Sequence, residues 1–211
     1  PKEEQKQKIT YNYMETKKNK TTLLIMAAGM GSRFGSLKQL ALLGPHKKTL
    51  LHYSIYDAVH AGFDKIVFII RRSFENEFKE AVGKYAESLV ETVYCFQEMD
   101  QLPGNLPPIQ REKPWGTAHA IWAAKDHIHE PFIAINADDF YGRDAFVKMH
   151  DFIADNQDER CFSLAGYQLA ATLSENGTVS RGICTVDQDN FLTSITERTK
   201  IGREGDTIKD M

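Results

Sequence analysis

The chain has 211 residues, 42% of them hydrophobic and 26% charged, which are ordinary proportions for a folded protein with a substantial core. Its formal net charge of −3 argues against a general nucleic-acid binder, because such proteins are normally basic. We find no apolar run near the roughly 18 residues of a membrane span and no secretory signal. We therefore expect neither a nucleic acid nor a membrane as partner.

The three cysteines, Cys95, Cys161 and Cys184, are widely spaced and form no C-x-x-C or zinc pattern. Cys161 and Cys184 lie in apolar segments, so we expect buried, reduced thiols. This pattern predicts a cytoplasmic protein.

Residues 1–20 are rich in lysine and lack apolar periodicity, which predicts a flexible basic arm. Residues 21–211 are then expected to form one domain. The predicted elements of this domain, in chain order, are a strand from Leu23, a helix over Thr49–Ala61 that stops at Gly62, a strand over Ile66–Ile70, a helix over Phe74–Tyr85, a strand over Thr92–Phe96, a Pro-rich loop over 100–114, a helix over Gly116–His127, a strand over Phe132–Ile135, a helix over Arg143–Ala154, and strands over Phe162–Leu169, Gly182–Val186 and Phe191–Ile195, the last two joined by a turn at Asp187–Asn190.

Strands that alternate with helices and then a strand-rich end predict a three-layer α/β/α sandwich around a mostly parallel, mixed sheet, a Rossmann-like fold. Ligands of open α/β sheets bind at the carboxyl ends of the strands. Three distinctive segments fall at such ends: residues 29–38, the loop before Gly116, and residues 136–139.

The first of these segments is a glycine-rich loop that directly follows an apolar strand. Glycines let backbone N–H groups approach a ligand closely, and a run of N–H groups forms a concave anion site. An arginine and a lysine add the positive charge that polyphosphates need. The alternative is a glycine-rich turn with solvated basic residues. We favour a nucleoside triphosphate loop formed by Ala27, Ala28, Gly29, Gly31, Ser32, Arg33 and Lys38.

Two other phosphate loops are excluded. A dinucleotide fingerprint would need a third glycine where Phe34 stands, and the next strand ends on Arg71 and Arg72 instead of a ribose-binding acid. Neither Gly29 nor Gly31 begins a Walker A pattern.

The remaining pattern, A-A-G-x-G-S-R-x-G with a lysine three residues later, resembles the opening of the sugar-phosphate nucleotidyltransferases, which include glucose-1-phosphate uridylyl- and thymidylyltransferases. The resemblance implies a nucleotide-diphospho-sugar transferase-like fold. It also implies that Arg33 and Lys38 contact the phosphates.

The segment Lys113-Pro114-Trp115-Gly116-Thr117-Ala118-His119-Ala120 is similar to a family segment whose glycine packs against the nucleotide base. Simple helix initiation would also explain it. The resemblance implies base contacts by Gly116 and Thr117, whereas Trp115 is expected to pack and His119 receives no catalytic role.

Asp138 and Asp139 end a hydrophobic strand, and adjacent carboxylates need a cation, a donor or solvent. Mg²⁺ binds through one or two carboxylates together with substrate phosphates. The family holds Mg²⁺ with a single aspartate at this place. We assign Asp138 as the Mg²⁺ ligand and expect Asp139 to form a turn.

Three residues near the end of the chain resemble the family's sugar-phosphate site: Gly166, Glu197 and Arg198. Family members commonly have Glu-Lys-Pro where this chain has Glu197-Arg198-Thr199, so either Arg198 or Lys200 holds the sugar phosphate. A packing glycine and an exposed strand end are the alternatives. The family's second metal-binding aspartate comes from a later strand. We therefore expect either a chain truncated at its C-terminal end or a second carboxylate from elsewhere.

Together these residues predict a Mg²⁺-dependent nucleotidyltransferase that joins an NTP and a sugar 1-phosphate into an NDP-sugar and pyrophosphate, with Arg33, Lys38 and Asp138 in catalytic roles. A cytidylyltransferase acting on phosphocholine or another non-sugar phosphate, a glycosyltransferase, and a non-catalytic domain that binds nucleotide sugars are the alternatives. The base and the oligomeric state, including a homo-oligomer, stay open.

Overall fold

The computed structural model describes residues 20–29, 42–43, 48–104, 115–156 and 158–210. The chain divides into two compact units, Pro1–Cys161 and Phe162–Met211, and each is described by itself. Within the described residues, no helix is long and apolar enough to cross a membrane.

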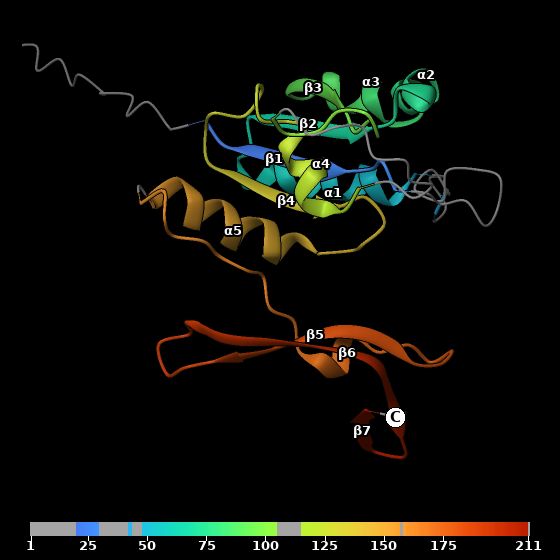
Figure 1. Cartoon of the computed structure of the whole chain (residues 1–211), viewed down its shortest axis with the longest axis vertical. Coiled ribbons are helices and arrows are strands. Elements are labelled where there is room, and N and C mark those ends of the chain that lie inside the picture. The colour runs from blue at the N-terminus through green and yellow to red at the C-terminus, as the bar shows by residue number, and fades with distance from the viewer. Residues whose placement is uncertain (1–19, 30–41, 44–47, 105–114, 157, 211) are drawn as a thin grey trace, which may run out of the picture. The chain divides into compact units, whose positions relative to one another are not determined.

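The first unit is built on a parallel four-stranded sheet with the strand order β3-β2-β1-β4 (Figure 1). Thr22 pairs with Lys65 on one side and with Phe132 on the other, so the three strands begin at one level and their carboxyl ends share one edge. The predicted α/β fold is confirmed. The strands are β1 (Thr22–Met26), β2 (Lys65–Ile70), β3 (Glu91–Phe96) and β4 (Phe132–Asn136).

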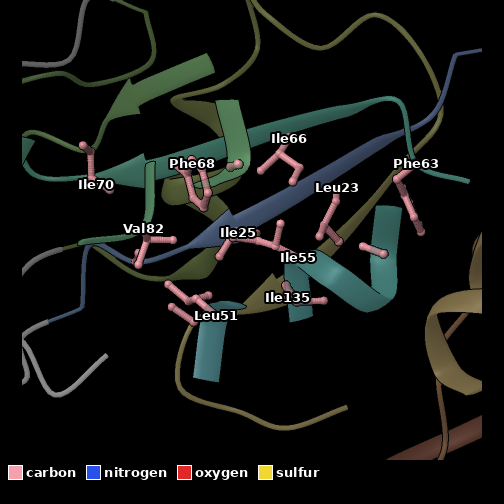
Figure 2. Packing of buried hydrophobic residues seen from close by; sticks show 14 of the residues in the cluster. Leu23, Ile25, Leu51, Ile55, Phe63, Ile66, Phe68, Ile70, Val82 and Ile135 are labelled. Atoms are coloured by element: carbon pink, nitrogen blue, oxygen red, sulfur yellow. The ribbon is translucent and has the colours of Figure 1, made fainter. Parts of the chain in front are cut away.

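Side chains alternate along β1, so its apolar residues project from both faces of the sheet. Helices cover each face and bury these residues. Leu23 and Ile25 pack with residues of α1 and α5, as the close view of this cluster shows for Leu51 and Ile55 (Figure 2). Leu24 packs with α4 on the opposite face. The unit therefore has three layers, α/β/α. The longer helices are α1 (Leu50–Ala61) and α5 (Arg143–Asp155), and the shorter ones are α2 (Glu75–Phe78), α3 (Lys84–Glu87) and α4 (Thr117–Trp122).

The segment predicted as one helix over Phe74–Tyr85 has several local geometries. A 3₁₀ turn precedes α2, and a π-helical turn, Lys79–Gly83, separates α2 from α3. At Gly83, a Cβ atom would lie only 2.2 Å from the hydroxyl oxygen of Tyr94. Glycine therefore allows the helix to approach β3 closely, a tertiary contact that apolar periodicity does not encode.

The helix predicted over Gly116–His127 is shorter than expected. It ends at Trp122 and continues as tight turns, in which Ala124, Lys125 and His127 each donate to the carbonyl three residues earlier. The helices predicted at α1 and α5 are confirmed, and Gly62 ends α1 with φ of 114°.

The second unit contains an antiparallel sheet with the order β5-β6-β7. The predicted turn at Asp187–Asn190 joins the first two strands, and Asp187 accepts backbone hydrogen bonds from Asp189 and Phe191 at 3.0 and 2.8 Å. The strands are β5 (Val179–Val186), β6 (Leu192–Glu204) and β7 (Thr207–Asp210). The strand after the turn is thus longer than predicted, and β7 was not predicted.

The strand predicted over Phe162–Leu169 is wrong. Residues 162–168 have no regular structure, and a short 3₁₀ helix, Leu169–Thr172, follows. A strand needs a neighbour for its backbone hydrogen bonds, and no described strand pairs with this apolar segment.

The prediction that Cys161 and Cys184 are buried is also wrong. Both are exposed free thiols, since Cys161 lies outside any strand and Cys184 lies in a strand whose side chains stay largely accessible. Only Cys95 is buried, and burial raises the pKa of its thiol to about 11.

Candidate nucleotide site

The chain leaves β1 between its two neighbouring strands at the carboxyl edge of the sheet. The Ala27 N–H donates to the Ile69 carbonyl at 2.8 Å, and the Ala137 N–H donates to the Met26 carbonyl at 3.1 Å. These bonds continue the pairing beyond the strands, so the segments leading to Gly29 and Asp138 emerge side by side. Of the predicted loop, Gly31, Ser32, Arg33 and Lys38 lie outside the described residues.

The two adjacent aspartates differ in their surroundings. The Asp139 carboxylate accepts a hydrogen bond from the Asn136 side chain at 2.9 Å and one from the Tyr141 hydroxyl at 3.4 Å. The same hydroxyl accepts from the Asn136 N–H at 2.9 Å, which closes the turn after β4. Asp138 is exposed, and no described residue hydrogen-bonds to its carboxylate.

Because Asp139 is held in the turn and Asp138 is not, Asp138 is the carboxylate that could hold a divalent cation. Its carboxylate is a hard oxygen ligand, and Mg²⁺ commonly takes one protein carboxylate and completes its shell with water and phosphate oxygens. Among the described residues, no group of three or more histidines, cysteines or acids is gathered for a metal. Asp138 could therefore offer a single carboxylate to a cation that takes its other ligands from elsewhere.

A cluster of polar and aromatic side chains joins the end of β3 to the start of α4. The Gln97 amide nitrogen donates to the carbonyls of Trp115 and Gly116 at 3.0 and 3.3 Å, and it lies 3.3 Å from His119 Nδ1. Since both carbonyls can only accept, the NH₂ group must face them. The Gln97 side-chain oxygen consequently points away from these carbonyls, and no hydrogen bond from a described residue reaches it.

His119 fixes the same cluster from α4. Its Nε2 lies 2.5 Å from the Gln101 carbonyl oxygen, which can only accept, so Nε2 carries the proton and Nδ1 is an acceptor that shares the two Gln97 N–H groups with the carbonyls of Trp115 and Gly116. The Trp115 ring stacks beside this imidazole, with centroids 5.8 Å apart, and its indole N–H donates to the Met99 carbonyl at 3.0 Å. Sequence reasoning missed Gln97, and it treated His119 only as a helix residue.

Gly116 and Thr117 are the residues predicted to contact the base. Gly116 is the residue before α4, and a Cβ atom there would meet no atom of the described residues within 4 Å. Both residues are exposed. Among the described residues, nothing fills the space beside the Gly116 backbone.

The predicted sugar-phosphate residues belong to the second unit. Glu197 pairs with Gly182 across β5 and β6, while Arg198 extends on the opposite face and forms an ion pair with Asp210 at 3.1 Å. Lys200 follows in β6, where the register with β5 is irregular between Arg198 and Ile201. Gly166 lies in the irregular segment, and within the part of the chain that the structure describes a Cβ atom there would have no neighbour within 4 Å.

Residues 22–198 match the family model described as nucleotidyl transferase. The chain belongs to this family. Among curated proteins, the chain is similar to the UTP–glucose-1-phosphate uridylyltransferase of Bacillus subtilis (strain 168). The two are 28% identical over 130 residues, a match that covers 55% of this chain and 43% of that protein. The chain thus spans less than half the length of this relative.

Two solved structures are similar at lower identity. One is a UDP-glucose pyrophosphorylase complexed with UDP-glucose, with 22% identity, a TM-score of 0.43, and coverage of 63% of this chain and 52% of that one. The other is Rv0371c from Mycobacterium tuberculosis H37Rv, with 19% identity, a TM-score of 0.44, and coverage of 64% and 60%.

Proposed function

We propose that this chain carries the nucleotide site of an enzyme that joins an NTP to a sugar 1-phosphate, giving an NDP-sugar and pyrophosphate. The carrying observation is the shared edge at which Gly29 and Asp138 leave neighbouring strands. Membership of the nucleotidyl transferase family supports this chemistry. The Bacillus subtilis relative is named for UTP and glucose 1-phosphate, so this is the first substrate pair to test.

In the proposed reaction, a phosphate oxygen of the sugar 1-phosphate attacks the α-phosphorus of the NTP. The bond from that phosphorus to the oxygen bridging to the β-phosphate breaks, and pyrophosphate leaves with the bonding electron pair. Such a displacement depends mainly on alignment and charge neutralisation.

The proposed roles follow from charge and position. Backbone groups from Ala27 to Gly31 and the Ser32 hydroxyl hold the triphosphate, Arg33 stabilises the departing pyrophosphate, and Lys38 holds phosphate oxygens near the reacting centre. Asp138 would hold Mg²⁺, which supplies positive charge to the phosphates when bound. Gly116 and Thr117 contact the base. Gly166, Glu197 and either Arg198 or Lys200 contact the sugar phosphate, and for the last role Lys200 is favoured because Arg198 is paired with Asp210.

The proposed enzyme acts in the cytoplasm. Three free thiols, two of them exposed, suit a reducing compartment.

The test is pyrophosphate release with Mg²⁺, four NTPs and a panel of sugar 1-phosphates and phosphocholine. We expect Asp138→Asn to lower turnover by about 10²–10³, the usual effect of removing one preorganised charge contact. Asp139→Asn is the matched control. Its carboxylate supports the turn, so we expect a loss of less than about tenfold.

Intrinsic tryptophan fluorescence checks the folding of each variant, because Trp115 and Trp122 both lie in the first unit. Near-normal turnover by a folded Asp138→Asn protein would contradict the metal assignment. Nucleotide binding by the wild type without any turnover would instead support a regulatory domain. A preference for phosphocholine as the acceptor would support the cytidylyltransferase alternative.

A further inference from the structure

Arg71 is a half-buried cation at the carboxyl edge of the sheet that the proposed reaction does not use. It follows β2 directly, and its Nε donates to the Ala28 carbonyl at 3.0 Å. That carbonyl belongs to the first residues of the chain after β1. Among the described residues, no carboxylate forms an ion pair with this guanidinium.

The strand pattern places Arg71 on the α4 face of the sheet. Val67 and Ile69 of β2 pack into the α4 cluster, and so does Ala28. Since side chains alternate along a strand, Arg71 continues the row of Val67 and Ile69, and its bond to Ala28 agrees with this. On the next strand, Gln97 also extends this face toward α4.

The neighbouring Arg72 is placed differently and provides a built-in comparison. Its guanidinium lies over the Phe96 ring, 3.9 Å from the centroid, and its backbone N–H donates to Glu98 at 3.2 Å. Phe96 packs against the cluster of the opposite face. The two consecutive arginines therefore serve opposite sides of the sheet, and Arg72 already has a protein partner.

We propose that Arg71 binds the phosphates of the bound nucleotide. Its guanidinium would act as a cation between Ala28, which follows β1, and Gln97 and Gly116, beside which the base is proposed to bind. This inference rests on the proposed nucleotide site. A guanidinium has five N–H donors, and Ala28 uses only the one on Nε. The bond to Ala28 fixes the plane of the group, and the four Nη protons stay available in a fork that matches two phosphate oxygens.

The experiment measures the affinity of the protein for UTP, inorganic triphosphate and uridine by calorimetry. We expect Arg71→Met to weaken UTP and inorganic triphosphate by about 10- to 100-fold, as for hydrogen bonds to charged groups, and to leave uridine within about twofold. Arg71→Lys keeps the charge without the fork and should fall between wild type and Arg71→Met. Arg72→Met is the matched control and should bind all three ligands as the wild type does.

The same series separates the competing outcomes. Wild-type affinity for UTP and triphosphate in folded Arg71→Met would overturn the role of Arg71 and leave the proposed function intact. An equal loss for UTP and uridine would also overturn it, because it would show that Arg71 only supports the loop at Ala28. Failure of the wild type to bind either UTP or triphosphate would refute the nucleotide site itself. If Arg71→Met loses the native tryptophan signal, the Arg71→Lys variant provides the test. If it binds triphosphate with the affinity and the salt dependence of the wild type, the proposed two-pronged contact of the guanidinium with phosphate is refuted.

Discussion

Replacement of Glu130 by glutamine tests what holds the amino edge of the first sheet. Glu130 lies just before β4 and accepts from Lys65 Nζ at 2.9 Å and from the Thr22 hydroxyl. The His129 N–H donates to its other oxygen at 3.0 Å. Side chains of Glu130 and Lys65 are only 17% and 10% exposed, so this is a largely buried ion pair that ties β1, β2 and β4 together.

The size of the effect follows from the pKa of Glu130. Burial works to raise this pKa, but the hydrogen bonds from Thr22, Lys65 and His129 outweigh it and lower the pKa from 4.5 to about 2. That difference corresponds to about 3 kcal/mol of preference for the ionised form. Partial screening by solvent reduces it to about 2 kcal/mol. Glu130→Gln also leaves Lys65 without its closest carboxylate, so we expect a loss of about 2–3 kcal/mol in the free energy of unfolding at pH 7.

Urea unfolding followed by tryptophan fluorescence measures this loss in the first unit. Because the folded pKa is lowered, the contribution of Glu130 is complete above pH 4.5 and disappears as the pH falls toward 2. The difference between wild type and Glu130→Gln should therefore shrink to roughly half by about pH 3. Glu80→Gln, which removes an exposed pair with Lys84, should change stability by less than about 0.5 kcal/mol. A Glu130→Gln protein as stable as the wild type at pH 7, or a difference independent of pH, would refute the reasoning.

Two further substitutions test contacts that the sequence did not predict. Gly83→Ala should lower the free energy of unfolding in urea by about 1–3 kcal/mol, because its Cβ would overlap the Tyr94 hydroxyl. Adding Tyr94→Phe should recover part of this loss. Helix propensity alone would make Gly83→Ala stabilising, and that result would contradict the contact. His119→Phe keeps a ring but removes the acceptor for Gln97, so we expect the KM for the NTP to rise about three- to tenfold with little change in kcat. His129→Phe, an exposed control, should leave both constants unchanged, and an equal fall in kcat for His119→Phe would argue against a positioning role.

The parallel sheet could be predicted because each of its strands is a short apolar run and Gly62 ends the intervening helix. Alternation of polarity does not reveal long-range partners. The predicted strand over Phe162–Leu169 had the right composition, yet no described strand supplies its hydrogen bonds. The exposure of Cys184 likewise depends on what covers β5 and not on its apolar neighbours.

The candidate site could be predicted only where its residues stand in a local motif or beside a predicted strand end. Asp138 was separable from Asp139 by family resemblance, and the structure adds a physical difference, since only Asp139 is held by Asn136 and Tyr141. Gln97 gives no motif signal, because its role depends on carbonyls 18 and 19 residues away along the chain. Arg71 appeared in the sequence only as the residue that excluded a dinucleotide site.

The charged side chains at the two edges of the first sheet differ in whether they have partners within the protein. At the amino edge, Lys65 and Glu130 satisfy each other, so their charges contribute to folding. At the carboxyl edge, Asp138 has no described partner, and Arg71 uses one of its five donors. Asp138 is exposed and Arg71 half-buried, so solvent still reaches both groups, and among the described residues neither charge is neutralised by an ion pair. In the proposed function, the phosphates of a nucleotide would pair with Arg71 and its metal ion with Asp138, so one ligand would carry the charges that complement both groups.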